Sequence, residues 1–148
     1  MAPDDAVELA RRCAAALWAG DRASQALGMR LEHVAPGRAT IAMRVRDDMV
    51  NGHGVCHGAF LVAIADSAFA FACNTYGEAT VAAGLEVTFV TSARLGDDLV
   101  AEARERVRYG RSGLYDVTVR HIDGRVVAEL RGRSHCLGRP ILTATDGS

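Results

Sequence analysis

The stretch NGHGVCHGAFLVAIADSAFAFACN, residues 51–74, decides how this chain folds. It begins as a loop rich in Gly and His and continues as an apolar segment in which Asp66 and Ser67 are the only polar residues between Ala59 and Cys73. A helix of this composition has no polar face, so we expect other parts of the protein to surround it on most sides. The segment is shorter than the roughly 20 apolar residues of a bilayer-spanning helix, so the sequence predicts a buried helix instead.

Asp66 is the residue of this helix that most needs an explanation. Its neighbours are apolar, so we expect the carboxylate to be buried, and an unpaired buried carboxylate either destabilises the fold or shifts its pKa upward. Stability alone does not favour such a residue, whereas an acid-base or nucleophilic task explains it. A solvated or salt-bridged structural acid is the alternative.

Composition limits the class of protein. A chain of 148 residues that is 49% hydrophobic fits one domain, residues 1–148. Seventeen basic and eighteen acidic residues give a net charge of -1, without a basic tail, so nucleic acid and membrane are not expected partners. Every basic residue is Arg, which reflects either codon bias or bidentate binding of phosphate and carboxylate. The acidic, amphipathic N-terminus does not resemble a secretory signal, so we expect a cytoplasmic protein with reduced thiols at Cys13, Cys56, Cys73 and Cys136.

Hydrophobic periodicity predicts the remaining elements. A helix is predicted over residues 4–19, within an N-terminal helical segment of residues 1–26. A two-residue turn at Asp123 and Gly124 joins the last two strands, and residues 139–148 are predicted to be a flexible tail. The predicted strands span residues 27–34, 38–45, 80–93, 99–109, 114–122 and 125–134.

These elements predict an α+β fold in which a curved antiparallel sheet of about six strands wraps one long central helix, with a further helix at the N-terminus. A helix that is apolar on all sides requires a sheet bent around it. One such sheet leaves an edge unpaired, so we expect a homo-oligomer.

Several of these motifs together resemble the hotdog-fold acyl-CoA thioesterases, in their phenylacetic-acid-degradation (PaaI-type) branch. The similarity lies in NGHGVCHG, in the AD that follows eight residues after its last Gly, and in SAFAFACN. It continues through LEVTFVTSARLGDDLVAEA, YGRSGLYDVTV and VAELRGRSHCLG, and covers residues 27–138. The resemblance implies a hotdog fold, a dimer or dimer of dimers (a homotetramer), hydrolysis of aromatic, phenylacetyl-type acyl-CoA, and no metal or organic cofactor.

The resemblance also implies roles for individual residues. The Gly58 backbone N–H polarises the thioester carbonyl, Asp66 acts as nucleophile or general base, and Asn51 and His57 flank the site. Two positions depart from the family pattern. Ala59 replaces the second Gly of HGG, and Ala82 or Ala83 stands where some relatives place a Ser or Thr that holds the attacking water.

Spacing adds a constraint to these roles. Gly58 and Asp66 are eight residues apart, about 12 Å along a helix, so one thioester carbon cannot meet both. The acid opposite Gly58 must come from an antiparallel second copy of the helix, which makes the catalytic unit a dimer. Coenzyme A carries three phosphates, for which the candidate ligands are Arg111, Ser112, Arg133, Arg104 and Arg106, although exposed Arg on a sheet often serves only solubility.

Alternatives remain for the loop residues. Gly58 is also consistent with a tight helix start, His57 with a helix cap, and Asn51 with a side chain that holds its own loop. Cys56 is a conceivable nucleophile, and a metal cluster would draw on His53, Cys56, His57, His135 and Cys136, although these lack the usual paired spacing.

Two other functions are consistent with the same fold. A hotdog enoyl-CoA hydratase or dehydratase requires an Asp and His pair in one loop, which the separation of Asp66 and His57 does not supply. A non-catalytic acyl-CoA binding module would bind the ligand without turnover.

Overall fold

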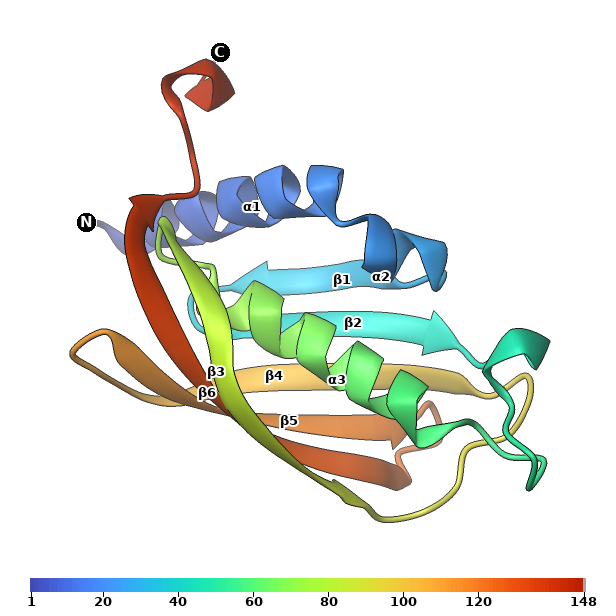
Figure 1. The fold of residues 1–148 in the computed structure, drawn as a ribbon. Helices are drawn as coiled ribbons and strands as arrows, with labels where there is room; N and C mark the ends of the chain where they lie inside the picture. Colours follow the sequence, from blue (N-terminus) through green and yellow to red (C-terminus); the bar gives the residue numbers. More distant parts are fainter. Residues whose placement is uncertain (148) are drawn as a thin grey trace.

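A curved, six-stranded antiparallel sheet holds one long helix on its concave side in the computed structural model, which describes residues 1–147 (Figure 1). The strand order is β1-β2-β4-β5-β6-β3, so β1 and β3 form the two edges. This is the α+β architecture that the sequence predicts. The strands are β1 (Arg30–Ala35), β2 (Arg38–Arg44), β3 (Glu78–Phe89), β4 (Asp98–Tyr109), β5 (Ser112–His121) and β6 (Val126–Pro140).

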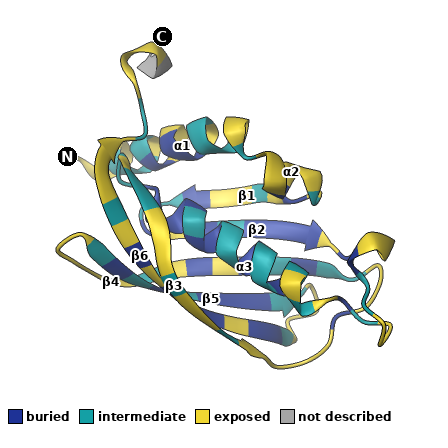
Figure 2. Ribbon diagram, viewed as in Figure 1, coloured by how far each residue is buried: buried dark blue, intermediate teal, exposed yellow. Residues whose placement is uncertain are grey.

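The central helix α3, Gly58–Cys73, packs against β2, β4 and β5 in the middle of the sheet. Figure 2 shows buried and less buried residues alternating along this helix. Gly132 of β6 makes one close contact possible, because a Cβ there would lie 2.8 Å from the Phe69 ring. The buried residues of α3 are Leu61, Ile64, Ala65, Ala68, Phe69, Phe71, Ala72 and Cys73.

Asn74 ends α3 and ties it to the start of β3. Its Nδ2 donates to the carbonyls of Ala70 and Thr80, both at 2.8 Å, and its Oδ1 accepts the Thr80 N–H at 2.8 Å. Asn74 is 5% exposed, so these bonds are shielded from water. One side chain therefore joins the end of α3 to the start of β3.

Two helices precede the sheet, where the sequence predicted one. Helix α1, Pro3–Gly20, lies along β1 and buries Ala10, Cys13 and Ala14. The short helix α2, Arg22–Ala26, was not predicted as a separate element. Asp21 starts it by accepting the Ser24 N–H at 3.0 Å, and the first strand consequently begins at Arg30 rather than at residue 27. None of the helices in residues 1–147 is long and apolar enough to cross a membrane.

The structure differs from the sequence prediction at three further places. A β-bulge between Glu105 and Val107 interrupts the alternation of β4, and Val107 is exposed. The turn between β5 and β6 is longer than the predicted two residues, because β5 ends at His121 and the His121 N–H bonds to the Arg125 carbonyl.

The third correction concerns the C-terminus. Strand β6 continues to Pro140, so the first two residues of the predicted tail belong to the sheet. The Ile141 N–H also donates to the Gly77 carbonyl at 2.9 Å. Ser148, the last residue of that predicted tail, lies outside the described residues.

Edge strand β3 exposes apolar side chains along its whole length. Val81, Leu85 and Phe89 are 45%, 44% and 55% exposed, and only β6 pairs with this strand. A long apolar edge of this kind is a surface that favours pairing with another strand.

The contact between Gly132 and Phe69 predicts a specific sensitivity of the core. Gly132→Ala adds a methyl group that overlaps the Phe69 ring, and overpacking of this kind costs about 1–3 kcal/mol. Gly52→Ala is the matched control, because a Cβ at Gly52 meets no atom within 4 Å. Thermal unfolding should show a lowered Tm for the first variant only; equal Tm values for both would contradict the packing described.

Candidate active site

A loop of backbone hydrogen bonds presents the first turn of α3. The Cys56 N–H donates to the Ala93 carbonyl and the His57 N–H to the Met49 carbonyl, both at 2.7 Å. The Asn51 N–H donates to the Val55 carbonyl at 2.8 Å. The residues immediately before Gly58 are therefore held on both sides.

Asn51 holds this loop through its side chain. Its Oδ1 accepts the N–H groups of His53 at 2.9 Å and Val55 at 3.3 Å. The structure therefore shows the alternative role of Asn51, in which its side chain holds its own loop. The Nδ2 of Asn51 has no acceptor among residues 1–147, so it remains a donor for another group.

His57 caps α3. Its Nδ1 accepts the Ala59 N–H at 3.0 Å, which is the capping alternative raised by the sequence. In the neutral ring the proton is then on Nε2, because Nδ1 is the acceptor. His57 is exposed, so this Nε2–H is accessible at the same helix end.

Gly58 is the first residue of α3, and its N–H has no acceptor in the part of the chain that the structure describes. Unpaired N–H groups at a helix start carry partial positive charge and attract anions. The Phe89 ring lies over this residue, 3.0 Å from the position of a Cβ at Gly58. A side chain at residue 58 would therefore crowd the Phe89 ring, a contact that the sequence did not reveal.

Asp66 is half-buried rather than fully buried. Burial raises the pKa of its carboxyl group, and no donor to this carboxylate is present within residues 1–147. The structure thus agrees with the prediction that this carboxylate is unpaired and that burial raises its pKa, although the burial is partial. Val62 and Ala70, one turn away on either side, are also half-buried, so the carboxylate lies on the strip of α3 that the sheet does not cover.

The single chain does not bring Gly58 and Asp66 together. Both lie on the uninterrupted helix α3, where eight residues correspond to about 12 Å. Asn51, His57 and Gly58 cluster at the start of the helix, and Asp66 lies in its second half.

The five candidate ligands for coenzyme A divide into two groups. Arg111 and Ser112, in the hairpin between β4 and β5, line a cavity of about 90 Å³ that also includes Cys73, the last residue of α3. Arg104 and Arg133 alternate with the buried residues Ala103 and Gly132, so they lie on the outer face of the sheet.

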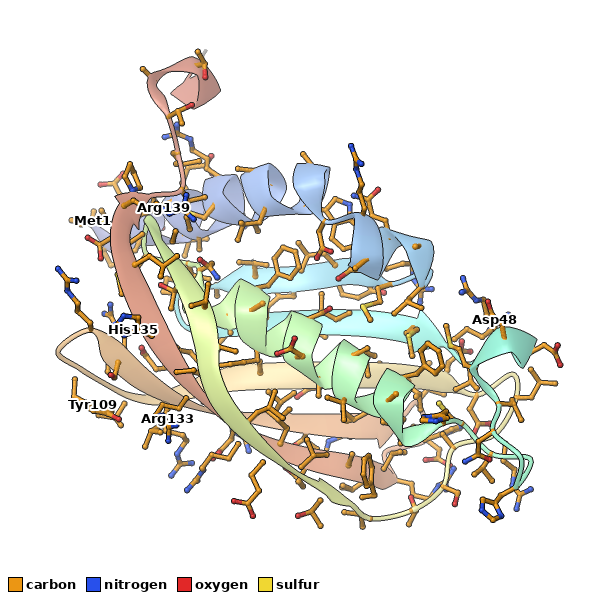
Figure 3. The ribbon with its side chains drawn as sticks, viewed as in Figure 1. Met1, Asp48, Tyr109, Arg133, His135 and Arg139 are labelled. Carbon is orange, nitrogen blue, oxygen red and sulfur yellow. The ribbon has the colours of Figure 1, made fainter. Side chains whose placement is uncertain are left out.

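Arg106 belongs with the outer group. Its Nε lies 3.6 Å from Asp116, which also accepts Arg131 at 2.8 Å. Figure 3 shows Arg133 at the same end of the sheet as Tyr109 of the β4–β5 hairpin. The cavity group thus lies on the α3 side of the sheet and the outer group on the opposite face.

The alternatives that involve Cys56 lose support. Burial, and to a lesser extent the nearby Asp97, raise the pKa of the Cys56 thiol to about 11, which disfavours the thiolate nucleophile. The proposed metal ligands are also separated: Figure 3 places His135 at the opposite end from Asp48, which leads into the 51–57 loop. No group of three potential ligands forms among the described residues 1–147.

The fold and this helix-centred site are those of a known class. The sequence model of the thioesterase superfamily matches residues 53–128, and the chain belongs to this superfamily of thioester hydrolases. The structure has the hotdog fold that the resemblance implied.

Particular relatives make the assignment more specific. Acyl-coenzyme A thioesterase PaaI of Escherichia coli is 38% identical over 85% of this chain and 90% of its own length. The structure of the E. coli PaaI protein from the phenylacetic acid degradation operon superposes with a TM-score of 0.89 and 36% identity, over 90% of this chain and 97% of that one. The TT0310 protein of Thermus thermophilus gives 0.74 and 39%, over 77% and 96%.

The raised pKa of Asp66 predicts how the stability of the fold depends on pH. Because this pKa is higher in the folded chain, ionisation of Asp66 opposes folding at every pH above its unfolded pKa of about 3.9. Asp66→Asn remains neutral and should raise the Tm near neutral pH, a gain that disappears as the pH falls below about 4.

Asp116→Asn is the control of opposite sign. Its hydrogen bond from Arg131 holds the pKa of Asp116 below the usual range, so this substitution should lower the Tm near neutral pH. Thermal melts across the pH range decide the matter, and a lowered Tm for Asp66→Asn at neutral pH would show that its carboxylate is well solvated or paired.

Proposed function

We propose that this chain is an acyl-CoA thioesterase that hydrolyses aromatic, phenylacetyl-type acyl-CoA to the free acid and coenzyme A. The observation that carries the proposal is the pairing on one helix of an unbonded N–H at Gly58 with an unpaired, desolvated carboxylate at Asp66. The 38% identity to the E. coli thioesterase supports the reaction class.

Gly58 serves as the electrophilic end of the site. When a thioester carbonyl is attacked, its oxygen gains negative charge, and a fixed N–H at a helix start stabilises that charge. The accessible Nε2–H of His57 and the Nδ2 of Asn51 are further donors at the same helix end. These three groups are already oriented because the loop and cap bonds hold them.

Asp66 serves as nucleophile or general base. Desolvation makes its carboxylate more basic than that of an ordinary aspartate. As a base it removes a proton from water, whose oxygen adds to the carbonyl carbon, and the C–S bond breaks as the proton passes to the departing thiolate. As a nucleophile it adds to the carbonyl carbon, and the C–S bond breaks to release the CoA thiolate and leave a mixed acyl anhydride. Water then hydrolyses this anhydride to the free acid and the Asp66 carboxylate, and the proton released goes to the thiolate.

The catalytic unit is a dimer in this proposal. Because about 12 Å separates Gly58 from Asp66 along α3, the two groups that act on one carbonyl belong to different chains. The apolar edge of β3, with Val81, Leu85 and Phe89 exposed, supplies a surface on which a second copy can add its own β3. Antiparallel pairing of these edges sets the two α3 helices side by side in opposite directions.

The cavity beside the β4–β5 hairpin fits the same arrangement. It lies at the Cys73 end of α3, about 22 Å along the helix from Gly58 of the same chain. In an antiparallel dimer that end approaches the Gly58 of the partner subunit. Arg111 and Ser112 would then bind phosphate groups of a coenzyme A whose thioester lies at the partner's helix start, with Arg133, Arg104 and Arg106 available on the outer face.

The acyl group is assigned to the uncovered strip of α3. Ala63 and Ala70 flank Asp66 there and are only half-buried, which leaves room for a flat ring beside the carboxylate. Phe89, 55% exposed above Gly58, supplies an aromatic wall. An aromatic acyl group therefore suits the shape and chemistry of this surface.

Loss of the Asp66 carboxylate should abolish turnover while the fold persists. Asp66→Asn and Asp66→Ala are expected to reduce kcat about a hundredfold or more, because the nucleophile or base is removed. Release of free thiol from phenylacetyl-CoA measures the rate. Asp48→Asn, which removes an exposed carboxylate paired with Arg46, is the control and should retain full activity. Near-normal thiol release by the Asp66 variants would refute the assignment.

Complementation between two inactive chains tests the shared site. Gly58→Val overlaps the Phe89 ring and blocks the helix start, and Asp66→Ala removes the acid. In a mixed dimer one of the two sites contains both intact residues, so random mixing should restore roughly a quarter of the wild-type activity. If both residues acted within one chain, unfolding and refolding the mixture would restore nothing.

A further inference from the structure

Three side chains join α2 to α3 directly beside Asp66. The hydroxyl of Ser24 lies 2.8 Å from the hydroxyl of Ser67 and donates to Asp21 Oδ2 at 2.7 Å. Asp21 Oδ1 accepts the backbone N–H of Ser24 at 3.0 Å. We call Asp21, Ser24 and Ser67 the serine relay; it connects segments that are 43 residues apart in the chain.

The carboxylate of Asp21 determines which hydroxyl of the serine relay is the donor in each hydrogen bond. An ionised carboxylate only accepts hydrogen bonds, so the single hydroxyl proton of Ser24 is directed to Asp21. The hydroxyl of Ser67 must then donate to Ser24. Ser24 is 3% exposed, and a hydrogen-bonded chain shielded from water is stronger than the same bonds in solvent.

A second contact lies on the same side of α3. Phe71 is four residues after Ser67 and therefore projects from the same face of the helix. Its ring lies 5.9 Å from the ring of Trp18, near the end of α1. The two N-terminal helices thus contact α3 at two successive turns, α2 at Ser67 and α1 at Phe71. Asp66 is adjacent to Ser67.

A helix that is apolar on nearly every side needs such a contact. Phe69 limits rotation of α3 on the sheet side, where it packs against Gly132, but apolar contacts specify one orientation less strictly than a directed hydrogen bond does. A single polar contact inside an apolar interface does specify one register. Asp66 and Ser67 are adjacent, so any rotation that breaks the bond of Ser67 also turns the carboxylate of Asp66.

We propose that the serine relay fixes the rotation of α3 and thereby aims the Asp66 carboxylate at the substrate. Ser67, Ser24 and Asp21 are positioning residues in this proposal, because they act through Asp66. The inference rests on the proposed function of Asp66, but the orientation itself can be tested without turnover.

The kinetic test uses single and double substitutions in the relay. Ser67→Ala and Ser24→Ala should each lower kcat about tenfold, because a carboxylate displaced by a fraction of an ångström meets the thioester less often, while KM changes less than about twofold. The double variant should be no slower than either single variant, since each one breaks the same connection. Ser67→Thr retains the hydroxyl and should restore most of the rate.

Thr118→Val is the matched control. Thr118 is also buried and also donates its hydroxyl to a carboxylate, Glu129, at 2.9 Å, but on the outer face of the sheet. The Thr118→Val variant should lose a comparable hydrogen bond while its kcat stays unchanged. Equal kinetic losses in Thr118→Val and Ser67→Ala, or additive losses in the double relay variant, would overturn the proposal.

A measurement independent of activity separates this inference from the proposed function. The titration of Asp66, followed by carboxyl-carbon NMR, should move toward the ordinary aspartate range in Ser67→Ala and Ser24→Ala, because a turned side chain gains water. It should remain unchanged in Thr118→Val. An unchanged titration in the relay variants would refute the aiming role even if turnover requires Asp66. If the wild-type protein releases no thiol, the proposed function fails, and this titration alone decides the orientation.

Discussion

The enclosure of helix α3 is the constraint on which the rest of the structure depends. Its apolar surface has to be removed from water, and a flat sheet would cover only one side of it. The observed sheet curves around the helix, and close approach is possible at β6 because Gly132 lacks a side chain where Phe69 packs. One strip remains uncovered within a single chain, and that strip contains the only carboxylate of the helix.

The position of that carboxylate gives the site its character. Water is partly excluded from Asp66 and no donor among the described residues compensates it, so its charge is maintained at the expense of stability. At the first turn of the same helix, the N–H of Gly58 is left without an acceptor in the described part of the chain. One helix therefore carries an unbonded N–H and an unpaired carboxylate about 12 Å apart, a separation that the proposed dimer accounts for. In the proposed dimer, two antiparallel copies of α3 place each Gly58 N–H opposite the Asp66 carboxylate of the other chain.

The sequence predicted those features that depend on long periodic segments. Helix α3 and strand β2 were identified closely, because composition and alternation are strong over their length. Helix α2 was missed since five residues are too few to show a period, and the bulge at Glu105 in β4 has no local signal. The extension of β6 was missed because Gly138 and Pro140 indicate a break, although Pro140 is tolerated at the end of the strand.

The same limit applies to the site. The desolvation of Asp66 was predicted from composition, and the cap made by His57 and the loop bonds of Asn51 were among the alternatives. The ring of Phe89 over Gly58 and the bond between Ser24 and Ser67 were not predicted, because each joins residues that are distant in the sequence. Contacts of this kind become visible only when the elements are placed in space.

The attachment of β3 to α3 has a mechanical consequence. Asn74 at the end of α3 forms hydrogen bonds with Thr80 near the start of β3, and Phe89 at the end of β3 lies over Gly58 at the start of α3. The edge strand is thus joined to the helix at both of its ends. In the proposed dimer, which forms along this edge strand, a contact made by the partner would therefore also act on the first turn of α3.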